Sequence, residues 1–140
     1  MPERALLYVR MEVKKQDIGE RLLDFSAEVI RLVDKLPDSS TAKKIIDQLT
    51  RSAMSVGANY EEAKGADSRA DFSYKLQIAL KEMRETCYWL CLIGRLELAG
   101  ANGRITPLID EATQLRAILG KAVATSRGKA RESAGIQAKS

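Results

Sequence analysis

Residues 41–65 decide the fold, and they read TAKKIIDQLTRSAMSVGANYEEAKG. Apolar side chains recur in this stretch at steps of three and four residues, which is the spacing of one face of an α-helix. This stripe consists of Ile45, Leu49, Ala53, Val56, Tyr60 and Ala63. Gly65 is a natural end for the helix, because glycine suits the backbone of helix C-termini. The stretch therefore predicts a long amphipathic helix from about 39–41 to Lys64.

The same helix carries a second stripe, which is polar. On a helical wheel its members fall in a fan about 80° wide, and they are Gln48, Arg51, Ser55, Asn59 and Glu62. A fully solvated face more often holds long Lys and Glu side chains than short Ser and Asn. We interpret the stripe as a partly buried polar seam. It is either a hydrogen-bonding network that fixes helix register or lines a subunit contact, or a ligand groove.

Three further helices flank this one. The first is predicted over 17–36, where Pro37 ends it, and its stripe is Ile18, Leu22, Phe25, Val29, Leu32 and Leu36. The next begins after Ser68 as N-cap and runs to about Leu98, with Phe72, Leu76, Ala79, Met83, Cys87 and Leu90 facing inward. The last begins with Thr106 as N-cap and Pro107 at its first position, with Ile105, Leu108, Ala112, Leu115, Leu119 and Ala122 facing inward.

Short connections between these helices predict an all-α protein, an antiparallel up-down-up-down four-helix bundle. The bundle is expected over residues 17–126. Residues 1–16 form an N-terminal arm that is either a short strand or flexible, and residues 127–140 form a basic flexible tail. A chain of 140 residues suits one such domain.

The helix predicted over 68–98 has more apolar surface than one core stripe requires. A second flank lies roughly 120° from the inner stripe. It holds Tyr74, Ile78, Trp89, Leu92 and Leu96, with the acidic Glu82 and Glu85 among them. Exposed apolar flanks usually meet a partner, and the simplest partner is another copy of the chain. We therefore expect self-association through this flank.

Composition argues against most enzyme classes. The sequence has no histidine, which removes the commonest general base and metal ligand. Its two cysteines, Cys87 and Cys91, lie on successive turns of one helix and are too few for a zinc site, so we expect neither a metal nor a cofactor.

The first fifteen residues carry charges throughout and the longest apolar run, 88–94, is too short for a membrane span. A cytoplasmic protein without membrane contact is expected.

The net charge of +4 comes from the two ends of the chain. Residues 1–16 hold four basic and two acidic side chains, and residues 127–140 hold four basic and one acidic, so the remainder carries −1. Basic ends attract nucleic-acid phosphates or simply keep a tail solvated. Candidate phosphate contacts are Lys43, Lys44, Arg127, Lys129 and Arg131.

Several of these residues together resemble a known family. They are Leu36-Pro37, Gln48, Arg51-Ser52, the run 55–59, Glu62, the run 68–72, Leu76, Ala79 and Glu85. The sequence is similar to the four helix bundle proteins, also called 23S rRNA intervening-sequence proteins, over about 17–123. The resemblance implies a bacterial bundle that assembles as a pentameric ring, with Gln48, Arg51, Ser55, Asn59, Glu62 and Glu85 at the family's polar positions. A more distant similarity links it to the accessory protein of diversity-generating retroelements, which binds a reverse transcriptase and nucleic acid.

Three functions remain open at this point. The first is a non-catalytic, self-assembling scaffold or binding protein that contacts a protein or RNA partner. The second is a nucleic-acid-binding accessory protein, with RNA, DNA or a reverse transcriptase as partner. The third, an enzyme built on Arg51, Glu62 and Glu85, is the least favoured because carboxylate metal centres in bundles usually include histidine.

Overall fold

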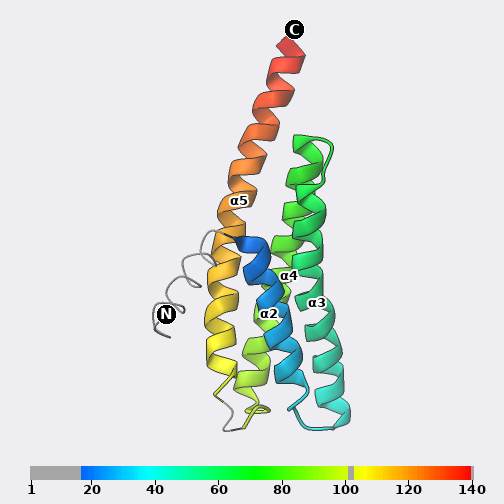
Figure 1. Ribbon diagram of the computed structural model, residues 1–140, viewed down its shortest axis with the longest axis vertical. Coiled ribbons are helices and arrows are strands. Elements are labelled where there is room, and N and C mark those ends of the chain that lie inside the picture. The colour runs from blue at the N-terminus through cyan, green and yellow to red at the C-terminus, as the bar shows by residue number, and fades with distance from the viewer. Residues whose placement is uncertain (1–16, 101–102, 140) are drawn as a thin grey trace, which may run out of the picture.

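The computed structural model describes residues 17–100 and 103–139, and four helices make up nearly all of them. The helices are α2 (Ile18–Val33), α3 (Ser40–Lys64), α4 (Arg69–Arg95) and α5 (Ile105–Lys139). They lie side by side as a bundle (Figure 1), and the described residues contain no strand. The all-α prediction is confirmed.

Side-chain caps fix where three of the helices begin. Asp17, Ser39 and Ser68 each accept a hydrogen bond from the backbone N–H three residues on, at 3.0–3.1 Å. These oxygens satisfy N–H groups that have no partner inside the helix. The prediction of Ser68 as N-cap is confirmed. Thr106 is not an N-cap, because α5 already begins at Ile105 and the Leu108 N–H donates to the Arg104 carbonyl at 3.3 Å.

Two predicted helix ends lie too far along the chain. Helix α2 stops at Val33 and not at Leu36. The Lys35 and Leu36 N–H groups bond three residues back, and Pro37 has no N–H to offer the Val33 carbonyl. Helix α4 stops at Arg95 and not at Leu98. Glu97 takes a left-handed backbone with φ 55°, and the Leu98 N–H bonds back to the Ile93 carbonyl at 3.1 Å. This is the Schellman arrangement that ends many helices.

Helix α5 is longer than expected. It continues to Lys139, through the residues that the sequence analysis assigned to a flexible tail from 127 onward. Part of this extension touches α4, because Arg127 donates to Gln77 at 2.7 Å and Arg69 donates to Ser133 at 3.2 Å. Beyond these contacts the end of α5 projects past the rest of the bundle (Figure 1). Residue 126 is therefore not a boundary of secondary structure.

Apolar side chains from all four helices form one core. Its largest fully buried members are Phe25, Leu22, Leu32, Leu49, Leu76, Met83, Leu90, Ile93, Leu115 and Leu119. Phe72, predicted to face the core, is 36% exposed, and its neighbour Ser73 is buried instead. Ser73 accepts a hydrogen bond from Ser126 of α5 at 3.0 Å. The inner face of α4 is thus rotated slightly from the predicted stripe.

Each helix packs against two others. Helix α2 contacts α3 and α5, and helix α4 also contacts α3 and α5. The face formed by α2 and α3 and the face formed by α4 and α5 therefore lie on opposite sides of the bundle. Within the described part of the chain, no helix is both long and apolar enough to cross a membrane.

Candidate functional site

The predicted polar seam lies along the edge between α3 and α4. Its centre is Arg51, which forms ion pairs with Glu82 at 3.1 Å and with Glu85. The hydrogen bond to Glu85, and then that to Glu82, raises the pKa of the Arg51 guanidinium. Gln48 accepts a further hydrogen bond from Arg51 at 3.4 Å. Gln48 and Arg51 of the predicted seam thus meet Glu85, which the family resemblance grouped with them, and Glu82.

The other seam residues do not join this cluster. The Asn59 amide donates to the carbonyl and the hydroxyl of Ser55, both at 2.9 Å. Glu62 pairs with Lys75 at 2.9 Å, and this hydrogen bond raises the pKa of the lysine ammonium. The Glu62 side chain is 59% exposed. Within one chain the seam is therefore three separate contacts and not one network. Ser55, Asn59 and Glu85 are half-buried, whereas Gln48, Arg51 and Glu62 are exposed.

A buried polar contact that was not predicted lies beneath the seam. The Thr86 hydroxyl donates to the Ser52 hydroxyl at 2.9 Å, and both residues are fully buried. Ser52 in turn donates to the Leu49 carbonyl at 3.2 Å. Ser52 lies beside the apolar stripe of α3 on the helical wheel, so its burial could have been predicted. Its pairing with Thr86 of α4 could not.

The predicted apolar flank of α4 divides between two faces. Trp89 and Leu92 pack against the core and are half-buried. The Trp89 ring also lines a hollow toward α3, and its buried indole N–H has no hydrogen-bond partner in the described part of the chain. Ile78 is half-buried, while Tyr74 and Leu96 are largely exposed. The five residues do not form one continuous exposed surface.

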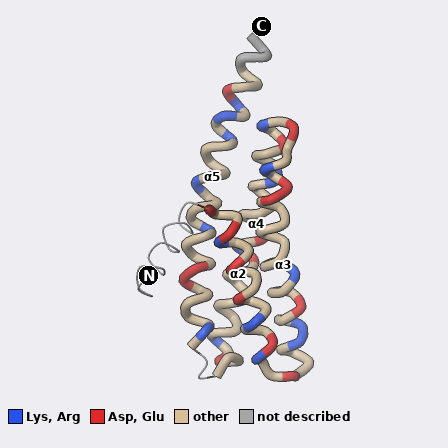
Figure 2. Tube along the Cα trace, viewed as in Figure 1, with Lys and Arg blue, Asp and Glu red and all other residues tan. Residues whose placement is uncertain are grey.

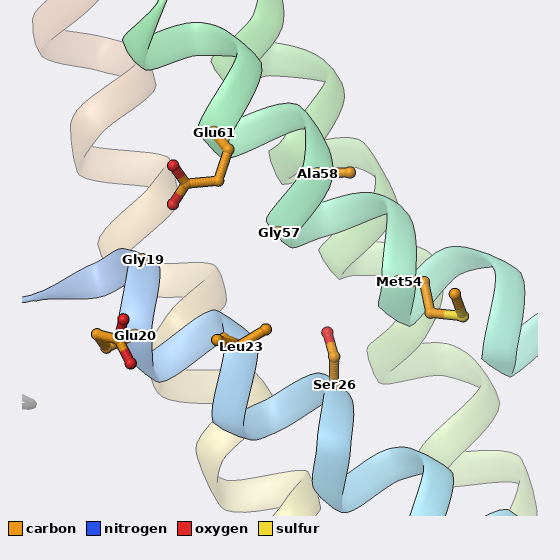
Figure 3. Close-up of a pocket in the computed structure, with 8 residues that line it drawn as sticks. All are labelled: Gly19, Glu20, Leu23, Ser26, Met54, Gly57, Ala58 and Glu61. Atoms are coloured by element: carbon orange, nitrogen blue, oxygen red, sulfur yellow. The ribbon is translucent and has the colours of Figure 1, made fainter.

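An apolar hollow lies between α2 and α3, where no site was predicted. We call it the α2–α3 groove, and Figure 3 shows its lining residues. It encloses about 420 Å³ and is lined by Gly19, Glu20, Leu23, Ser26, Met54, Gly57, Ala58 and Glu61. Leu23 is 64% exposed and Met54 is 55% exposed. Both residues lie outside the apolar stripes of their helices, which is why periodicity missed them.

A second hollow lies on the side of the bundle that α4 and α5 form. We call the surface lined by its residues the α4–α5 face. The hollow encloses about 390 Å³ and is lined by Tyr74, Gln77, Ile78, Leu80, Lys81, Arg84, Val123 and Arg127. Three of these residues are cations and none is acidic. Lys81 and Arg84 form no ion pair within the described part of the chain.

The predicted phosphate contacts fall into two groups. Lys43 and Lys44 are exposed in the first turn of α3. Arg127, Lys129 and Arg131 are exposed on α5 toward its C-terminal end. These positions lie at opposite ends of the bundle (Figures 1 and 2). They do not form one basic patch, and only Arg127 belongs to the α4–α5 face.

No group of three or more His, Cys, Asp or Glu residues in the described ranges is arranged to hold a metal ion.

Comparisons with known proteins bear on the whole bundle. The family model described as 23S rRNA-intervening sequence protein matches residues 14–121. A crystal structure from Bacteroides thetaiotaomicron, described as a protein of unknown function from the S23 ribosomal protein family, is 34% identical in sequence. The match has a TM-score of 0.69 and covers 76% of this chain and 98% of that chain. The search of curated proteins found no match.

Proposed function

Because the chain belongs to the 23S rRNA-intervening sequence protein family, we propose that it is a non-catalytic protein that assembles with copies of itself into a scaffold. One observation carries the proposal. Large apolar side chains, among them Leu23, Met54 and Tyr74, stand exposed on both faces of a bundle whose core is already complete. Apolar surface of this kind is usually covered by a partner. The lack of histidine supports the non-catalytic assignment.

The proposal includes an up-down-up-down order of the helices and a closed ring of copies, five by resemblance to the family. The order of the contacts between helices supports this topology. Ser52 of α3 meets Thr86 of α4, and Glu62, later in α3, meets Lys75, earlier in α4. In the same way Ser73 meets Ser126, while Arg69 meets Ser133. Sequential helices that run in opposite directions give this reversed order.

The test is the mass of the native particle, measured by size exclusion with light scattering. We expect a particle of about five chains that contains no nucleic acid, both with and without nuclease treatment during purification. A single chain at concentrations of tens of micromolar would contradict self-assembly. A stable dimer would keep self-assembly and exclude the ring.

A second candidate is a nucleic-acid-binding accessory protein, and one feature favours it. The C-terminal part of α5 carries the exposed Arg127, Lys129 and Arg131 alongside the start of α4. Cations that neutralise phosphates give binding that weakens steeply with salt. If this candidate is right, the native particle retains RNA or DNA, or binds a reverse transcriptase that does. A chain trimmed to residues 17–126 would then lose this affinity.

A further inference from the structure

The α2–α3 groove and the α4–α5 face lie on opposite sides of the same molecule. Contacts between α3 and α4 also place them at the same height along the bundle. Ser52–Thr86 and Glu62–Lys75 mark two levels about three helical turns apart. The α3 residues of the groove, Met54 to Glu61, lie between these levels. The α4 residues of the opposite face, Tyr74 to Arg84, cover almost the same interval.

The charges of the two surfaces are opposite. The groove contains Glu20 and Glu61 and no cation. Glu61 reaches from α3 toward the first turn of α2 (Figure 3), and its carboxylate is 3.2 Å from the Lys64 ammonium at the rim. Two carboxylates against one nearby ammonium leave this surface acidic. The α4–α5 face contributes Lys81, Arg84 and Arg127 without an acidic residue.

Each surface also combines a hollow with an exposed apolar side chain. In the groove, the exposed Leu23 and Met54 stand beside a hollow that is also lined by the small residues Gly19, Gly57 and Ala58. On the opposite face Tyr74 is 59% exposed at the edge of the second hollow. An exposed tyrosine is a common anchor in protein interfaces, because it buries a large area at small cost in conformational entropy.

We propose that the α2–α3 groove of one copy binds the α4–α5 face of the next copy, with Tyr74 entering the groove. Glu20 and Glu61 then lie opposite Lys81 and Arg84 of the neighbour, and Leu23 and Met54 cover Ile78. The contact joins two different surfaces, so each copy offers one of each and the assembly grows head to tail. Because both surfaces lie at one height, neighbouring copies stand level with each other. The inference rests on the proposed self-assembly and assigns its interface.

Charge reversal on each surface tests the contact. The first variant carries Glu20→Lys and Glu61→Lys, and the second carries Lys81→Glu and Arg84→Glu. Each places like charges opposite each other, so each is expected to dissociate to single chains at a concentration where the unmodified protein assembles. The chain carrying all four substitutions pairs a basic groove with an acidic face, and it is expected to assemble again.

Matched controls separate the contact from net charge and from folding. Asp110→Lys with Glu132→Lys changes the net charge as the first variant does. Lys43→Glu with Lys121→Glu changes it as the second does. These four residues are exposed and lie outside both surfaces, so both controls are expected to keep the assembled mass. Circular dichroism of every variant shows whether the helices are retained.

The outcomes distinguish this interface from self-assembly in general. If the unmodified protein is a single chain, both proposals fail. If it assembles and the reversed variants keep its mass, self-assembly stands and this interface is wrong. The interface is also wrong if the fourfold variant is folded but stays a single chain. Loss of RNA binding without a change of mass in Lys81→Glu with Arg84→Glu would assign the face to phosphate and overturn the proposal.

Discussion

At the residue scale, the Ser52–Thr86 contact joins α3 to α4 inside the core. Replacing Thr86 by Val leaves the buried Ser52 hydroxyl without its donor, and we expect the free energy of unfolding to fall by about 1 kcal/mol. Thr113→Val is the matched control, because Thr113 is exposed and its hydroxyl donates to the Ile109 carbonyl of its own helix. Urea denaturation measures both. Ser52→Ala combined with Thr86→Val is expected to cost less than the two single changes together, and strict additivity would contradict the coupling.

The two cysteines are expected to differ in reactivity. Burial raises the pKa of the Cys87 thiol, while Cys91, one turn on, is exposed. Because the thiolate is the reactive form, iodoacetamide at pH 8 is expected to modify Cys91 in the folded protein and Cys87 only after denaturation. Mass spectrometry of the native and the denatured chain gives the sites, with Cys91→Ser as control. Equal labelling of both cysteines in the native protein would contradict the packing of α4 against the core.

At the element scale, α4 depends on its N-terminal cap. The Ser68 hydroxyl accepts the Asp71 N–H at 3.0 Å, and Ser68→Ala leaves that donor to water. We expect a loss of about 1 kcal/mol in the free energy of unfolding, measured by denaturant titration. Ser68→Asp keeps an acceptor at the cap and is expected to retain the stability. Equal losses in both variants would mean that the serine acts otherwise than as a cap.

Different parts of helix α5 are expected to contribute unequally to the thermal stability of the protein. Ser126, Arg127 and Ser133 contact α4. A chain that ends after residue 134 keeps these contacts, so its melting temperature is expected to match that of the full chain. A chain that ends after residue 125 loses them and is expected to melt several degrees lower, because Ser126 is buried against Ser73. Equal melting temperatures for the two truncated chains would show that the extension is not part of the folded bundle.

At the scale of the whole molecule, the proposed assembly combines apolar contacts with opposite charges. Salt screens the charges, and the screening length falls to about 3 Å at 1 M. We therefore expect the assembled fraction to decrease between 0.05 M and 1 M sodium chloride at low micromolar protein, measured by analytical ultracentrifugation. The fourfold charge-swapped chain is expected to show the same trend. An assembly that strengthens with salt would indicate that apolar contact alone joins the copies.

The sequence by itself determined the four helices of the described residues and most of their inner faces. Helical periodicity is a local property, so the stripe of Ile45, Leu49, Ala53 and Val56 identified the buried side of α3. Capping is local as well, and Ser68 was identified for that reason. The end of α4 was missed because the left-handed Glu97 carries no signal of the kind that glycine gives.

Only the tertiary structure determined which residues at the edges of the apolar stripes are buried and which are exposed. Phe72 and Ser73 are neighbours at such an edge, and the position of α5 selects Ser73 for the core. Arg21 is buried where α2 meets α5, and Glu111, far along the chain, pairs with its charge. The groove beside Leu23 and Met54 likewise depends on how α2 lies against α3. Periodicity gives the direction of each side chain from its own helix axis, whereas exposure depends on the neighbouring helices, whose positions are set by packing of the whole core.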